Sequence, residues 1–259
     1  MKTGSKALPI GNLVAFTAFF SVNMLAAAGL VNNTTPQAVS DSYPNLFTPA
    51  GFTFAIWGVI YLLAALFVLF GLGAFKGKAG GSQDAVRRVG PWFIVSSAAN
   101  AAWIFAWHYK NIPLSLALMA VLLLSLIFAY QGIAAAPLSF KEKLFVRLPF
   151  SVYLGWITVA AIANATVLLV SLHWNGFNLP AQFWAIFMLA AGLGIGAVFV
   201  LRFRDVPFGL VLIWAYLGIL IRHITVLNGE FPEVIKALIL FLIGAVFVTS
   251  LVGVLPDKK

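Results

Sequence analysis

The sequence predicts an all-α protein, a polytopic membrane helical bundle of about eight transmembrane helices. Of its 259 residues, 62% are hydrophobic and only 9% are charged, whereas a soluble domain has about 25% charged residues. Apolar runs recur along the whole chain, and each approaches the roughly 20 residues that a helix needs to cross a bilayer. Lys and Arg gather at alternate ends of these runs, as they do when successive helices cross in opposite directions.

Turn-forming residues separate the expected spans. Lys110, Asn111 and Pro113 mark the turn between the third and fourth runs, and Pro207 opens the seventh. We expect Pro49 in the first turn of the second helix. The first run resembles a signal peptide, but it is long enough to span, so we interpret it as a helix. The approximate limits of the eight runs are 8–31, 49–74, 89–109, 112–134, 148–171, 180–201, 206–227 and 233–254.

The charges predict an orientation. One side collects most of the basic residues: Lys2, Lys6, Lys76, Lys78, Arg87, Arg88, Lys141, Lys143, Arg147, Arg202, Arg204, Lys258 and Lys259. The other side carries Asp41, Lys110, Glu230 and Glu233. The positive-inside rule therefore places both termini in the cytoplasm. Because topology explains the net charge of +9, we expect no nucleic-acid partner.

Several kinds of chemistry are absent from the sequence. The chain has no cysteine, which excludes thiol nucleophiles, disulfides and thiolate metal sites. Its three histidines have no local ligand spacing, and no nucleophile–base arrangement or pair of intramembrane carboxylates is visible. We therefore assign no catalytic residue and no metal ligand, and we do not favour an enzyme.

The fifth expected span carries polar and aromatic residues on one side. Tyr153, Trp156 and Asn164 stand at i, i+3 and i+11 within an apolar run, so they project from roughly one face of a helix. An amide in lipid is costly unless it has a partner, and Tyr and Trp each carry a polar group that seeks one. This stripe is the strongest functional signal in the sequence.

Two further spans repeat the pattern. In the third span, Asn100, Trp103 and Trp107 stand at i, i+3 and i+7, and in the second, Trp57 and Tyr61 stand at i, i+4. With the predicted orientation, these residues lie at about the same depth in the membrane as the fifth-span stripe. All of them would then lie under the outer loop 32–48. They predict a pocket for a flat apolar molecule. The alternative is a packed core in which Asn side chains hydrogen-bond neighbouring helices.

Other aromatic and charged residues lie near span ends. We interpret Trp92, Trp174 and Trp184 as part of the interfacial aromatic belt. Arg222 lies near the outer end of the seventh span, where it either pairs with Glu230 or Glu233 or contacts an anionic group of a ligand.

At these residues the sequence resembles the translocator protein / tryptophan-rich sensory protein (TspO/MBR) family. The similarity covers about residues 8–172 and rests on three motifs. The motif residues are Pro49, Trp57 and Tyr61 in the second span, Asn100 and Trp103 in the third, and Tyr153, Trp156, Ala160 and Asn164 in the fifth. The whole chain, with three further spans, resembles the longer bacterial members of the family.

The resemblance implies a TspO-like five-helix core at 1–172 and three additional transmembrane helices at 173–259, in a bacterial inner membrane. It implies binding of a porphyrin-like or other tetrapyrrole ligand for transport or sensing, with no required cofactor. Expected partners are a hydrophobic small molecule, membrane lipid, and a second copy or another membrane protein. The ligand-binding residues we expect are Trp57, Tyr61, Asn100, Trp103, Trp107, Tyr153, Trp156, Asn164 and Arg222. The competing functions are a secondary transporter of another small molecule and a membrane enzyme acting on lipid or isoprenoid substrates.

Overall fold

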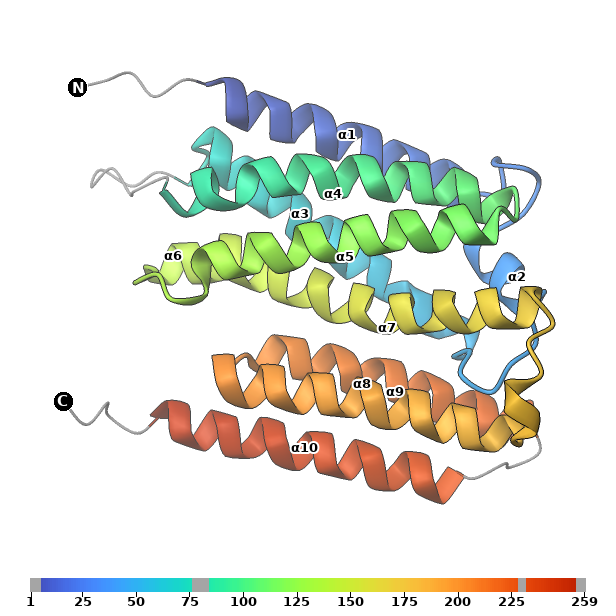
Figure 1. Ribbon diagram of the computed structural model, residues 1–259. Coiled ribbons are helices and arrows are strands. Elements are labelled where there is room, and N and C mark those ends of the chain that lie inside the picture. The colour runs from blue at the N-terminus through green and yellow to red at the C-terminus, as the bar shows by residue number, and fades with distance from the viewer. Residues whose placement is uncertain (1–5, 76–83, 228–231, 255–259) are drawn as a thin grey trace. The chain divides into compact units, whose positions relative to one another are not determined.

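The computed structural model describes residues 6–75, 84–227 and 232–254, and the side chains of this last segment from 233 to 248 (Figure 1). Within these residues the chain is helical, apart from turns and one isolated bridge between Val31 and Thr34. Seven described helical segments are long and apolar enough to cross a membrane: Ala7–Ala27, Gly51–Leu72, Asp84–His108, Ile112–Ala134, Phe140–Ser171, Ala181–Phe203 and Val206–Thr225. They confirm the predicted polytopic helical membrane bundle.

These segments correspond to named helices. The crossing helices are α1 (Ala7–Ala27), α3 (Ile56–Leu72), α4 (Asp84–His108), α5 (Ile112–Ala134), α7 (Leu148–Ser171), α8 (Ala181–Phe203) and α9 (Val206–Thr225). The short elements are α2 (Pro36–Asp41), η1 (Gly51–Ala55), α6 (Phe140–Glu142), η2 (Lys143–Arg147) and η3 (Gly176–Asn178). Helix α10 (Pro232–Val254) occupies the eighth expected span.

Side-chain caps set the helix starts that the sequence predicted. The Asn111 side chain accepts a hydrogen bond from the amide of Leu114 (3.3 Å), and α5 begins directly after it. Asp205 caps α9 in the same way, accepting from the amide of Phe208 (3.1 Å), which satisfies a backbone donor that the first turn leaves free. The expectation for Pro49 was wrong, because the helical segment begins at Gly51.

Backbone contacts divide the chain into two compact units. Unit 1 comprises Met1–Val39 and Ile56–Leu154, and unit 2 comprises Ser40–Ala55 and Gly155–Lys259. The division therefore falls within α7. The domains expected from the family resemblance, 1–172 and 173–259, stay a prediction.

Unit 1 is built around α4, which lies against both α1 and α5 (Figure 1). Its core includes three phenylalanines from different helices. Phe67 contacts Phe93 and Phe150 edge to face, with ring centroids 5.1 Å apart in both pairs, and each of the three is at most 2% exposed. The cavity lined by these rings and by Tyr153 has a volume of only about 10 Å³.

Unit 2 contains α8, α9 and α10, which pack against one another (Figure 1). Small residues allow α8 and α9 to approach closely. A Cβ at Gly192 would lie 2.7 Å from the Tyr216 hydroxyl oxygen, and a Cβ at Gly196 would lie 2.9 Å from Leu212. The Tyr216 hydroxyl donates to the carbonyl of Leu189, which gives this fully buried group a partner.

Candidate functional site

In unit 2, residues 40–55 form a strap along α9. Near one end of the strap, the Asp41 carboxylate pairs with the Arg222 guanidinium at 2.7 Å. Beside this pair, His223 Nε2 donates to the carbonyl of Leu46 at 2.8 Å. A charge-assisted hydrogen bond and a ring hydrogen bond therefore hold this part of the strap in place.

The other end of the strap is held by backbone groups. The Ala50 amide donates to the carbonyl of Gly218 (3.0 Å), and Trp214 Nε1 donates to the carbonyl of Thr53 (3.0 Å). The Phe52 ring also meets the Trp214 ring edge to face at 5.4 Å. A Cβ at Gly218 would lie 2.0 Å from Thr53 Oγ1, so the strap can reach α9 only because residue 218 is glycine.

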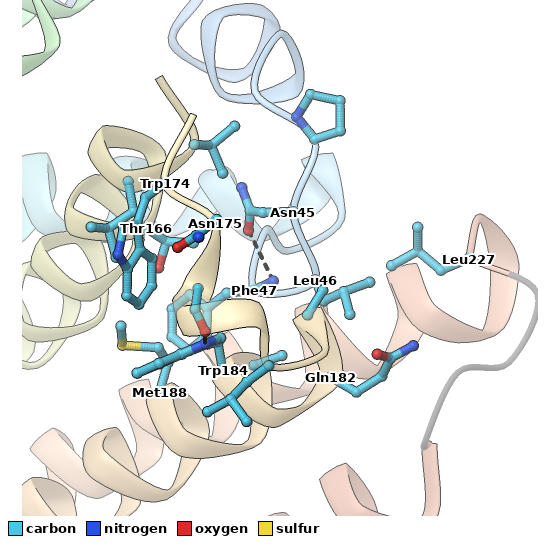
Figure 2. A pocket seen from close by; sticks show the side chains of 17 residues that line it. Asn45, Leu46, Phe47, Thr166, Trp174, Asn175, Gln182, Trp184, Met188 and Leu227 are labelled. Carbon is cyan, nitrogen blue, oxygen red and sulfur yellow. Dashed lines mark hydrogen bonds between the residues drawn. The ribbon is translucent and has the colours of Figure 1, made fainter. Parts of the chain in front are cut away.

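A cavity of about 500 Å³ lies between the strap, the end of α7, η3 and the first turns of α8 (Figure 2). It is lined by Pro44, Asn45, Leu46, Phe47, Thr166, Leu169, Val170, Trp174, Asn175, Gly176, Leu179, Ala181, Gln182, Trp184, Ala185, Met188 and Leu227. Most of these side chains are apolar, and all of them are uncharged. This is the composition of a site for a hydrophobic small molecule.

Two tryptophans from either side of η3 form one wall. Their rings meet edge to face, with the centroids of Trp174 and Trp184 4.7 Å apart. Trp184 Nε1 donates to the carbonyl of Gly176 (3.0 Å). Gly176 has φ +62°, and a Cβ on it would lie 2.9 Å from Trp184 Nε1, so a glycine turn lets the indole pack against the backbone. The turn thereby fixes the orientation of an aromatic face in the cavity.

Three carboxamides, of Asn45, Asn175 and Gln182, are the main polar groups of the lining (Figure 2). Asn45 accepts from the amide of Phe47 (2.9 Å) and donates to the carbonyl of Tyr43 (2.8 Å). Asn175 accepts from the amide of Phe177 (3.1 Å). Each amide has two hydrogens and two lone pairs, so these asparagines can hold their loops and still bond a ligand.

None of the nine residues predicted to bind ligand lines this cavity. Three of them form an aromatic cluster in unit 1. Trp57 stacks on Tyr61 (5.8 Å) and meets Tyr153 edge to face (6.0 Å). Phe19, which is fully buried, lies 5.5 Å from Tyr61 and 6.1 Å from Tyr153. These rings contact one another as in a hydrophobic core.

The third-span stripe also lies in unit 1. Asn100 is fully buried, and its side-chain oxygen accepts from Asn23 Nδ2 at 2.7 Å. Trp103 stacks on Trp107 at 5.5 Å, and Trp107 Nε1 donates to the carbonyl of Pro36 (3.0 Å). The amide thus makes the interhelical hydrogen bond of the packed-core alternative.

The remaining predicted residues belong to unit 2. Trp156 and Asn164 are buried, at 4% and 2% exposure, and Trp156 meets Phe54 edge to face at 6.1 Å. Arg222 lies on α9 in its pair with Asp41. The assignment of all nine residues to ligand binding stays a prediction.

Of the two expected partners of Arg222, Glu233 was wrong. Arg222 pairs with Asp41, and Glu233 instead bonds Lys236 three residues along α10, at 2.7 Å. Glu230, the other expected partner, lies outside the described residues. Nothing in the sequence indicates the pair with Asp41, because the two residues are 181 positions apart in the chain.

The cavity itself was missed. Trp174 and Trp184 were assigned to the interfacial belt from their places near span ends, yet both line the cavity. One feature of the sequence could have indicated the cavity: two tryptophans flank one short turn that contains Asn175 and Gly176. Within the described part of the chain, no three His, Cys, Asp or Glu side chains lie together as metal ligands would.

The described helices that are long and apolar enough to cross a membrane define the class: an integral membrane protein with several helical spans. The chain belongs to the TSPO-like protein family, whose model matches residues 9–252. This match covers both units and reaches into α10. Comparisons with curated proteins and with solved structures gave no match.

Proposed function

We propose that this protein of the TspO kind binds a flat hydrophobic small molecule, porphyrin-like in shape, for transport or sensing. The observation that carries the proposal is the cavity of about 500 Å³ in unit 2. Ligand sites in proteins typically measure about 300–1,000 Å³ and combine apolar walls with few polar groups. With the predicted orientation, this cavity opens toward the outer side of the membrane.

The aromatic wall favours a flat ligand. The Trp174 and Trp184 rings belong to a group of aromatic side chains that gather around η3. Aromatic rings stack on planar molecules in offset or edge-to-face geometry. Met188, which also lines the cavity, is a flexible and polarizable side chain that adapts to a ligand's outline.

The residues singled out from the sequence remain the competing location for the same ligand. Trp57 is half-buried and Asn100 is fully buried, and their aromatic neighbours would have to move apart to admit a planar molecule. The cavity of unit 2 needs no such rearrangement, which is why we favour it.

A titration with protoporphyrin IX tests the proposal. The purified full-length protein in detergent is titrated, and the change in porphyrin absorbance reports binding. Met188→Trp fills part of the cavity, and we expect it to weaken binding at least about tenfold, or about 1.4 kcal/mol. Leu240→Trp is the matched control, because Leu240 is 67% exposed on α10.

The outcomes separate the two locations. Weaker binding in Met188→Trp with unchanged binding in Leu240→Trp supports the cavity. Unchanged binding in Met188→Trp, together with loss in Trp57→Leu and Asn100→Ala, moves the site to the residues predicted from the sequence. Absence of saturable binding by the wild type, both of protoporphyrin IX and of its uncharged dimethyl ester, contradicts the proposed function.

A further inference from the structure

Among the residues that the structure describes, no charged side chain lines the cavity of unit 2. Figure 2 draws its 17 lining residues, and every one has a neutral side chain. Natural tetrapyrroles carry carboxylates, and a carboxylate moved from water into an apolar site is strongly destabilised unless it is both paired with a cation and hydrogen-bonded. The charge of the lining therefore bears on which ligands the cavity accepts.

Arg222, the cation nearest in sequence to the lining residue Leu227, is already paired. Its guanidinium bonds the Asp41 carboxylate at 2.7 Å, and its side chain is only 16% exposed. Arg222 does not line the cavity. A ligand carboxylate would have to displace Asp41 and break one of the contacts that hold the strap.

The other described cations of unit 2 are unsuitable. Lys236 bonds Glu233 at 2.7 Å. Arg202 and Arg204 lie at the opposite end of α8 from Gln182, which at 1.5 Å rise per residue is a distance of about 30 Å. His173 precedes Trp174 in the chain but is exposed and does not line the cavity.

The carboxamides supply neutral recognition instead. Asn45, Asn175 and Gln182 come from the strap, the turn before η3 and α8, so hydrogen-bonding groups reach the cavity from three elements. An amide offers both a donor and an acceptor. Such groups match the hydroxyl, carbonyl or ester of an uncharged ligand, but they bring no positive charge to pair with a carboxylate.

We infer that the cavity selects an uncharged ligand: a flat hydrophobic molecule with a neutral hydrogen-bonding end, and not a carboxylate-bearing tetrapyrrole. The inference rests on the proposed function, because it names the ligand class of the same cavity. On this inference the ligand has no carboxylate for Arg222 to pair with.

Two probes with the same ring test the inference. Protoporphyrin IX carries two carboxylates, and its dimethyl ester carries none. Both are titrated into the full-length protein in one detergent at pH 8, and we expect the ester to bind at least about tenfold more tightly, because only the acid must place an unpaired charge in the cavity. Binding in the cavity is the part of the signal that Met188→Trp removes.

A positive charge placed in the lining should weaken the preference for the ester. Gln182→Lys puts a cation at the cavity, and we expect the ratio of ester to acid affinity to fall at least about tenfold. Gln182→Met is the matched control, similar in length and uncharged, and it keeps the wild-type preference. Because the detergent is the same throughout, differences in micelle partition between the probes cancel in the comparison of variants.

The outcomes are distinct. Tighter binding of the ester, with a lower ratio in Gln182→Lys alone, supports the inference. Equal or tighter binding of the acid by the wild type overturns it while leaving the proposed function intact. If neither probe gives a signal that Met188→Trp removes, the proposed function fails and the inference fails with it.

Discussion

The same residue types are used in opposite ways in the two units. In unit 1, Trp57, Tyr61 and Tyr153 contact one another, and the cavity beside Tyr153 measures about 10 Å³, roughly the room for one water. In unit 2, Trp174 and Trp184 stand at a cavity of about 500 Å³. Aromatic side chains therefore fill the interior of unit 1, whereas in unit 2 they also border an open space.

The amides differ in the same way. In unit 1, the buried side chains of Asn100 on α4 and Asn23 on α1 bond each other between the two helices. In unit 2, Asn45 and Asn175 bond the backbone of their own loops and remain at the lining of the cavity. An amide between helices stabilises their packing, whereas an amide that orders a loop beside a cavity is placed to meet a ligand.

The largest contrast is expected from truncating one side chain in each unit. Phe19 is fully buried, so Phe19→Ala removes a core ring and should lower the free energy of unfolding by about 3–5 kcal/mol. Met188→Ala removes a half-buried side chain that already borders a void, so it should cost less than the ~2–5 kcal/mol of truncating a buried Met. Unfolding in a denaturing detergent titration measures both costs. Equal costs would contradict the contrast between a filled core in unit 1 and an open cavity in unit 2.

The contact of the strap with α9 provides the second test. Gly218→Ala places a methyl group against Thr53, and overpacking of this kind costs about 1–3 kcal/mol. Gly194→Ala is the control, because no atom lies within 4 Å of the added Cβ. Thermal unfolding should show a loss in the first variant and none in the second. If adding Thr53→Gly to the Gly218→Ala variant restores the wild-type melting temperature, the loss comes from a clash between these two residues.

The buried amide pair of unit 1 provides the third test. Asn23→Ala, Asn100→Ala and the double variant form a cycle around the 2.7 Å hydrogen bond. We expect a coupling of about 0.6–1.7 kcal/mol, the range for hydrogen bonds between membrane helices. Porphyrin affinity should not follow this coupling. Affinity that falls in step with stability would mean that Asn100 contacts the ligand.

The smallest effect is expected at the ion pair of the strap. Asp41 and Arg222 are partly exposed, at 36% and 16%, and exposed pairs contribute about 0.2–1 kcal/mol. A cycle of Asp41→Asn and Arg222→Gln should give a coupling in this range that weakens with added salt. A coupling that does not change with salt would mean that the pair is sealed from solvent.

The fold was largely predictable from the sequence. Apolar runs and turn residues such as Asn111 and Pro207 located the spans, because a bilayer imposes a length on each helix. Pairings between distant residues were not predictable. Arg222 bonds Asp41 and not the nearer Glu233, because the strap returns along α9 and brings a distant carboxylate to it.

The candidate site was only partly predictable. Helical periodicity identified which aromatic residues share a face, but it contains no information on whether the facing space is filled. The sequence therefore favoured Trp57 as a pocket residue and Trp184 as a belt residue, although both rings meet other rings and only Trp184 also lines the cavity of about 500 Å³. The choice between core and site depends on tertiary packing.

Fluorine NMR of the protein labelled with 5-fluorotryptophan tests the comparison most directly. The chain has eight tryptophans, and single Trp→Phe variants assign their signals. On titration with protoporphyrin IX dimethyl ester, we predict that the signals of Trp174 and Trp184 shift in a saturable way while those of Trp103 and Trp107 stay in place. Saturable shifts at Trp103 and Trp107, with Trp174 and Trp184 unchanged, would contradict the assignment of the ligand to unit 2.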